Sequence, residues 1–278
     1  MQPASVIHDI GYQRYTGPRL GRRYAARSLY AHGLRTVFAL GRPAKSKVFP
    51  WAMIAVMVLV AVIDIAIRAL ADEMPISYLG FCDDLTLPLA LFLAATAPEL
   101  LSRDLRDNVL PLYFSRPLSR ADYAWVKLAA IWSGLWLFYA GPMLLIFVAG
   151  EFTVDSWHAR VKELTDFLGG LGLAGIYAVV FGAVGLLIAS WLKRRMVAAA
   201  LIVGYILVTT AIGAVVGAIL GGRNGDAVGA MFSPPALVLG LKDWVYQVHE
   251  PAIGHLGPVF LLVTVLFTGG CVALLHTR

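Results

Sequence analysis

The sequence predicts an all-α integral membrane protein with six transmembrane helices, preceded by a cytoplasmic amphipathic (elbow) helix. The first observation is composition: the 278 residues are 59% apolar and 14% charged, with a mean hydropathy of +0.74. Soluble domains carry about 25% charged residues, and a chain of this size cannot hide so much apolar surface in one core. The second is that the apolar residues form long runs without the alternation of barrel strands. An ordinary soluble enzyme is therefore excluded.

Six runs are long enough to cross a hydrocarbon core, which takes roughly 20 helical residues. A cytoplasmic arm, residues 1–50, precedes a transmembrane domain, residues 51–278. A further apolar stretch at 227–241 contains Pro234 and Pro235 and is too short to span, so we expect an outer re-entrant or interfacial segment there. The six spans are expected at 51–70, 85–101, 128–149, 168–192, 196–220 and 257–275.

The basic residues predict the orientation. The segments 1–50, 102–127, 193–195 and 276–278 hold 9, 5, 3 and 1 of the 23 Lys and Arg residues, whereas the three loops on the other side hold four. Because cytoplasmic loops are enriched in Lys and Arg, we expect both termini in the cytoplasm. The expected location is the cell inner (cytoplasmic) membrane, crossed several times.

An amphipathic pattern precedes the first span, at residues 22–42. One interpretation is a helix in the cytoplasmic interface, with its cations facing anionic lipid headgroups. The other is a helix packed on a cytoplasmic partner. The cations Arg23, Arg27 and Arg35 fall outside the apolar face, which consists of Ala26, Leu29, Tyr30, Gly33, Leu34, Val37 and Phe38.

Small residues recur every four positions on the fifth span, at Thr209, Gly213, Gly217 and Gly221. Such a stripe lets another helix approach closely. It predicts either helix packing within the chain or an interface with a second subunit.

Two charged residues lie inside the first span. Asp64 and Arg68 are four residues apart, so they share a helix face and can pair. They form either a neutralised pair near the outer end of the span or a polar element lining a route across the membrane.

Catalytic and metal-binding motifs are absent from the sequence. No Walker A motif occurs, so the chain does not bind ATP through a P-loop. The outer loop 150–167 holds Glu151, Asp155, His158, Glu163 and Asp166 mixed with Arg160 and Lys162, which predicts a solvated surface rather than an active site. The two cysteines, Cys82 and Cys271, are expected at opposite membrane faces, which excludes a disulfide between them. We therefore expect a non-catalytic chain without a metal or cofactor of its own.

The most informative segment is the inward loop between the second and third spans. Arg103 and Asp107 can pair across one turn, and Pro111 and Pro117 predict an extended bend. Ser119 and Asp122 form a predicted capping box that starts the next helix at Arg120. Aromatic and cationic residues near the tip, namely Tyr113, Phe114, Arg116 and Arg120, are typical of interface anchors. The alternative is that these arginines only follow the positive-inside rule.

Residues 112–127, Leu-Tyr-Phe-Ser-Arg-Pro-Leu-Ser-Arg-Ala-Asp-Tyr followed by Lys127, resemble the loop between spans two and three of ABC export permeases of the second type, the ABC-two superfamily. The six-span layout, the basic elbow and the broken segment before the last span are similar too. The matching residues are Arg103, Asp104, Ser115, Pro117, Ser119, Arg120 and Lys127.

The resemblance implies a permease subunit of an exporter for a hydrophobic or amphiphilic substrate. Its implied partners are a second permease copy or a homologous permease, membrane lipids, and a separate ABC ATPase subunit that binds ATP and Mg; no nucleic acid is implied. The coupling loop to the ATPase would comprise Arg103, Asp104, Arg106, Asp107, Tyr113, Phe114, Arg116, Pro117 and Arg120.

Three other functions remain open. An ion-coupled secondary transporter would need charges at mid-membrane, and four of the six spans have none. An integral-membrane enzyme acting on lipids would need His, Asp or Glu clustered at one membrane face. A membrane anchor for an assembly would need neither.

Overall fold

The computed structural model describes residues 17, 20–71, 76–115, 118–152, 156–247 and 256–277, apart from the side chains of Ala71 and Arg223. Within these ranges every regular element is a helix. Five helices are long and apolar enough to cross a membrane, and a bent pair makes a sixth if it is counted as one span. The prediction of an all-α, multi-pass membrane protein is thus confirmed at this level.

Five helices contain predicted spans, and most of them begin earlier than expected. They are α2 (Ala44–Ala71), α7 (Arg120–Glu151), α8 (Trp157–Trp191), α9 (Arg195–Leu220) and α12 (Gly257–Thr277). The extra turns carry polar residues, which the hydropathy of the sequence could not assign to a span. As a consequence α2 reaches seven residues into the predicted arm, and α8 takes up most of the predicted outer loop 150–167.

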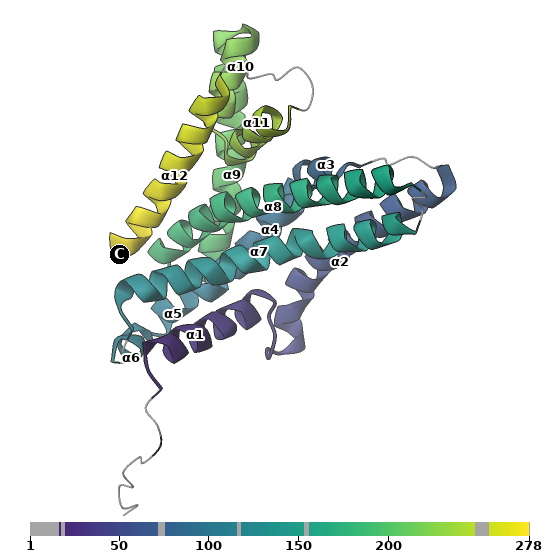
Figure 1. Cartoon of the computed structure of the whole chain (residues 1–278). Helices are drawn as coiled ribbons and strands as arrows, with labels where there is room; N and C mark the ends of the chain where they lie inside the picture. Colours follow the sequence, from purple (N-terminus) through teal and green to yellow (C-terminus); the bar gives the residue numbers. More distant parts are fainter. Residues whose placement is uncertain are drawn as a thin grey trace, which may run out of the picture.

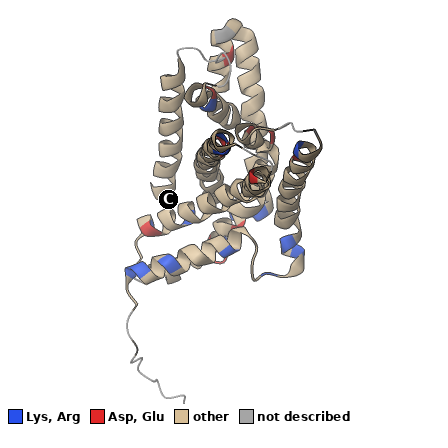
Figure 2. Cartoon of the chain, turned by 45° about the vertical axis from the view of Figure 1, so that its right-hand side comes forward, with Lys and Arg blue, Asp and Glu red and all other residues tan. Residues whose placement is uncertain are grey.

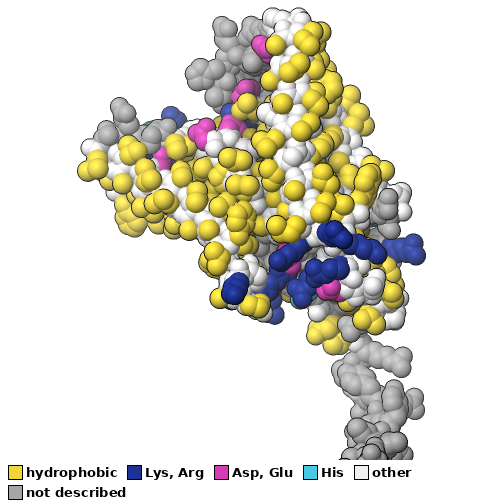
Figure 3. Space-filling model, turned by 180° about the vertical axis from the view of Figure 1, so that it is seen from behind, with side chains coloured by type: hydrophobic (Ala, Val, Ile, Leu, Met, Phe, Trp, Pro, Cys, Tyr) yellow, Lys and Arg dark blue, Asp and Glu magenta, His cyan; other side chains and the backbone are white. Residues whose placement is uncertain are grey.

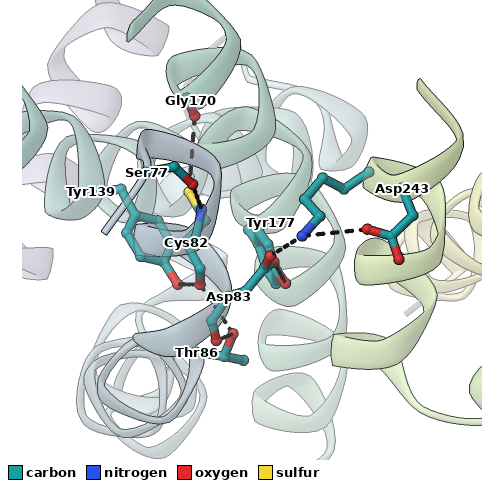
Figure 4. Close-up of polar contacts among 10 residues, drawn as sticks. Ser77, Cys82, Asp83, Thr86, Tyr139, Gly170, Tyr177 and Asp243 are labelled. Carbon is teal, nitrogen blue, oxygen red and sulfur yellow. Dashed lines mark hydrogen bonds and ion pairs between the residues drawn. The ribbon is translucent and has the colours of Figure 1, made fainter. Parts of the chain in front are cut away.

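The second predicted span, 85–101, matches one helix, but a shorter helix precedes it at an angle. α3 (Tyr78–Asp84) and α4 (Thr86–Leu100) meet at Leu85 with a bend of 58°. Hydroxyl groups satisfy the carbonyls at the break. Tyr139 Oη donates to Cys82 O, and Thr86 Oγ1 donates to Cys82 O and Asp83 O (Figure 4). Tyr139 Oη also donates to Leu85 O. Pro88, in the first turn of α4, has no N–H for Asp84 O and so interrupts the helix, while the hydroxyl donors satisfy carbonyls that the bend leaves in a low-dielectric interior.

The core lies along α7 and α8, which run side by side in Figure 1. Of the residues in the apolar 18-residue stretch of α8, 61% are buried, whereas the share in the corresponding stretches of α2 and α9 is only 17%. Stacked rings of Phe92 and Phe138, 4.4 Å apart, join α4 to α7. The outer helices therefore expose apolar belts, visible in Figure 3, that include Leu59, Leu207 and Leu266. Such belts suit contact with lipid or with another membrane chain.

The predicted amphipathic helix is present as α1 (Arg22–Val37), and it lies along α7 (Figure 1). Its Leu29 and Val37 side chains are buried. A methyl group at Gly33 would lie 2.8 Å from Ala130 Cβ, so the two helices approach very closely. Protein therefore covers much of the apolar face that we expected to meet lipid, while Figure 2 shows that cations remain on the helix and at the start of α2.

The predicted outer segment 227–241 forms two short helices, α10 (Gly222–Ala230) and α11 (Pro234–Tyr246). Pro234 and Pro235 lie in the first turn of α11, where proline costs no helical hydrogen bond. α10 folds back against α9, and α11 lies beside α12 and α8 (Figure 1).

Candidate functional site

The inward loop contains two short helices between α4 and α7. They are α5 (Ser102–Arg106) and α6 (Leu110–Phe114), and both lie near α1 at the basic end of the molecule (Figure 1). Pro111 occupies the first turn of α6, so the extended bend predicted there is instead a helical turn. Arg116 and Pro117 lie outside the described residues.

The entry into α7 follows the sequence prediction. Ser119 Oγ accepts a hydrogen bond from the amide of Asp122, and the Asp122 carboxylate accepts one from the amide of Ser119. This capping box fixes the start of α7 at Arg120. Arg22 of α1 also pairs with Asp122, so the same carboxylate joins two helices.

The base of the loop is held by a buried ion pair that the sequence pattern did not reveal. Lys127 Nζ lies 2.7 Å from Asp104 Oδ2 and donates to Leu100 O, also at 2.7 Å. Tyr123 Oη donates to the same Asp104 oxygen at 2.7 Å. Lys127 is only 2% exposed. Asp104 in α5 is therefore fixed to α7 by two donors.

A second bond fixes the loop to α8. The buried Ser102 Oγ donates to Ala189 O at 2.9 Å, near the end of that helix. Hydrogen bonds thus join α5 to both core helices, α7 and α8.

The tip of the loop is exposed and combines apolar, aromatic and cationic groups. Leu112 is 67% exposed and Phe114 is 36% exposed. The guanidinium of Arg120 lies 5.9 Å from the centre of the Phe114 ring, at cation–π distance. Tyr113 lies against Tyr123, with ring centres 5.6 Å apart. The tip therefore exposes aromatic and cationic side chains, while the base of the same loop is held by the Asp104–Lys127 ion pair.

Three charged residues form an exposed cluster beside the tip. Asp107 pairs with Arg103 at 3.5 Å, as expected from their spacing, and with Arg106 at 3.0 Å. The hydrogen bond from Arg106, followed by its charge and by Arg103, lowers the pKa of Asp107.

Arg68 forms its ion pair with Glu163 of α8 instead of with Asp64. The two guanidinium nitrogens donate to the two Glu163 oxygens at 2.8 and 3.0 Å, and Tyr78 Oη donates to Oε1 at 2.6 Å. Asp64 accepts from the amide of Ile76. The Glu163 carboxylate accepts from two guanidinium nitrogens of Arg68 at once, and such bidentate pairs are stronger than pairs with a single hydrogen bond. Glu163, which we expected on a solvated surface, is 7% exposed.

A second polar cluster holds the outer helix α11 against the core (Figure 4). Asp83, next to the bend between α3 and α4, accepts hydrogen bonds from Tyr177 Oη at 2.8 Å and from Lys242 Nζ. Lys242 also lies 3.4 Å from Asp243. Tyr246 Oη donates to Gly169 O at 2.9 Å. These contacts tie α11 to α3 and α8, and the sequence pattern gave no sign of them.

The small-residue stripe on α9 faces α10 of the same chain. A methyl group at Gly213 would lie 2.6 Å from Gly229 O, and one at Gly217 would lie 3.1 Å from Asp226 Oδ1. Gly221 has a φ of +63° and turns the chain from α9 into α10. Thr209 Oγ1 donates to Tyr205 O within α9. The geometry thus supports packing within the chain, one of the two expectations for this stripe.

The described residues offer neither a cluster of metal ligands nor a disulfide. No group of three or more His, Cys, Asp or Glu in that part of the chain is placed to hold a metal ion. Cys82 and Cys271 are both free and buried.

The fold and this loop define a class, a multi-pass helical membrane protein with a braced projection at its basic end. No family model matches the chain, and no curated protein matches it either.

Proposed function

We propose that this chain is the permease subunit of an ATP-binding-cassette exporter, driven by a separate ATPase subunit that carries ATP and Mg. The observation that supports this most directly is the inward loop, which has an exposed aromatic–cationic tip and a buried ion pair at its base. A projection bonded to two core helices transmits a displacement, whereas a flexible one absorbs it.

In this proposal the ATPase binds at the tip of the loop, around Phe114 and Arg120. Closure of the ATPase moves α5 and α6, and the Asp104–Lys127 and Ser102–Ala189 bonds carry that movement into α7 and α8. The transmembrane helices then alternate between inner and outer access. Both termini and the loop are in the cytoplasm, as the distribution of basic residues favours.

The weakly buried helices α2, α9 and α12 supply apolar surface for a second permease copy and for lipid. With so few charges inside its spans, the proposed pathway suits a hydrophobic or amphiphilic substrate.

Purification of the full chain from the membranes of its own host, in mild detergent, tests the proposal. We expect a subunit with a Walker A motif to co-purify, and the complex to hydrolyse ATP in the presence of Mg. The control is the same purification with the tip variant Phe114→Ala/Arg120→Glu, which should lose that subunit. Transport by the chain alone, driven by a proton gradient in vesicles, would contradict the proposal and favour the ion-coupled alternative.

A further inference from the structure

A strongly basic pocket lies where α1, the start of α2, α4 and α9 meet. It has a volume of about 940 Å³, and its walls contain six cations, Arg35, Arg42, Lys45, Arg103, Arg106 and Arg195, against a single carboxylate, Glu99. Figure 3 shows a band of Lys and Arg directly below the apolar belt. That is the depth at which a membrane protein meets lipid headgroups.

Glu99 organises two of these cations. Its two carboxylate oxygens each lie 2.8 Å from an arginine nitrogen, one from Arg42 and one from Arg195. Each guanidinium has five N–H donors, so donors remain for a phosphate. Arg35 and Lys45 are exposed and have no acidic partner in the part of the chain that the structure describes. Asp107 pairs with Arg103 and Arg106, so two carboxylates oppose the six cations and the pocket keeps an excess of positive charge.

His32 lies in the wall of the same pocket. Burial lowers its pKa most, and the neighbouring cations Lys127, Arg103 and Arg42 lower it further, while Asp104 opposes them. The six cations in the walls, and not this shift alone, favour an anion in the pocket.

An apolar groove continues from the pocket into the membrane-facing surface. Its volume is about 530 Å³, within the usual range for a small-molecule site, and it shares Arg42, Lys45, Glu99 and Arg195 with the pocket. Side chains from three spans form the apolar part, namely Phe49, Pro50, Leu91, Ala95, Ala200 and Val203. Phe49 is 48% exposed, so the groove opens toward the apolar belt.

From this juxtaposition we propose that the chain binds a phospholipid with an anionic headgroup, its phosphate in the basic pocket and one acyl chain in the apolar groove. A soluble phosphate would fill only the pocket and leave the adjoining apolar surface in water. A zwitterionic lipid would fill the groove but offer no net charge to the cations. The inference rests on the membrane assignment and not on the identity of any partner subunit.

Native mass spectrometry of the detergent-purified full chain tests this site, with dioleoyl phosphatidylglycerol and dioleoyl phosphatidylcholine as probes. We expect the wild-type chain to prefer phosphatidylglycerol. In the variant Arg35→Gln/Lys45→Gln that preference should fall about 25-fold, because each cation near an anionic headgroup contributes about fivefold. Both residues are exposed, so the fold should persist, which an unchanged unfolding temperature would verify.

The matched control is Lys193→Gln/Arg194→Gln, which removes the same charge from exposed residues outside both spaces. It should keep the wild-type preference. Ala200→Trp fills the groove from an exposed position and should reduce binding of both lipids. An excess of inorganic phosphate should not displace phosphatidylglycerol.

Four results would overturn the proposal. They are equal binding of the two lipids by the wild-type chain, an unchanged preference in Arg35→Gln/Lys45→Gln, an equal loss in the control variant, and displacement of the lipid by phosphate. The last result would assign the pocket to a soluble anion.

Discussion

Replacing Phe114 by Ala and Arg120 by Glu is expected to weaken the binding of the ATPase subunit by about 30-fold or more. Interface anchors of these residue types contribute about 1 kcal/mol or more each, and about 2 kcal/mol for the pair corresponds to about 30-fold in affinity. Here the Arg120 guanidinium lies over the Phe114 ring, and both groups are exposed at the loop tip. The affinity is measured with the purified chain and the co-purified ATPase in detergent, together with the lipid-stimulated rate of ATP hydrolysis.

Arg194→Glu is the matched control for that variant. It reverses one exposed cation in the short segment between α8 and α9, at the same basic end of the chain. We expect near wild-type affinity from it. If Arg194→Glu weakens binding as much as the double variant, general electrostatic attraction rather than the loop tip holds the ATPase.

Replacing Lys127 by Met should destabilise the fold by about 3–5 kcal/mol. The substitution keeps the apolar stem and removes an ammonium group that is 2% exposed, which leaves the Asp104 carboxylate and Leu100 O without that donor. Breaking a buried pair from one side costs this much because a charge remains uncompensated. Equilibrium unfolding in detergent micelles measures the loss.

A double-mutant cycle with Asp104→Asn separates the ion pair from packing. The double variant Lys127→Met/Asp104→Asn should be more stable than Lys127→Met alone, since no isolated charge remains. Lys193→Met, which removes an exposed cation at the same end, should change stability by less than about 0.5 kcal/mol. Additive losses in the cycle would show that Lys127 and Asp104 are not coupled.

Local sequence patterns predicted the features that depend on local physics. Apolar runs marked the membrane-spanning helices, and the Ser119–Asp122 spacing predicted the start of α7 correctly, because a capping box involves only neighbouring residues. The same holds for the Arg103–Asp107 pair, which is one helical turn apart.

The sequence pattern did not predict the ion pairs and hydrogen bonds between residues that are far apart in the chain. Arg68 has an acidic neighbour one turn away, yet its partner Glu163 is 95 residues distant. Lys242 and Asp83 are 159 residues apart. Pro88 signals a break near Leu85, because it has no N–H to donate to Asp84 O, but the bend also depends on the hydroxyl of Tyr139 in another helix. Burial makes these polar contacts strong, and burial is a property of the whole fold.

Site-specific photo-crosslinking from position 112 tests the central claim, that the inward loop receives the ATPase, most directly. Leu112 is 67% exposed at the tip and has no role in the base of the loop, so a photoreactive residue there leaves the fold intact. The control position is Leu266 in α12, which is 64% exposed on the apolar belt. The account predicts that position 112, and not position 266, captures a subunit with a Walker A motif in host membranes. Capture of that subunit from Tyr24 on α1, with none from position 112, would contradict the account and assign the contact to the N-terminal helix.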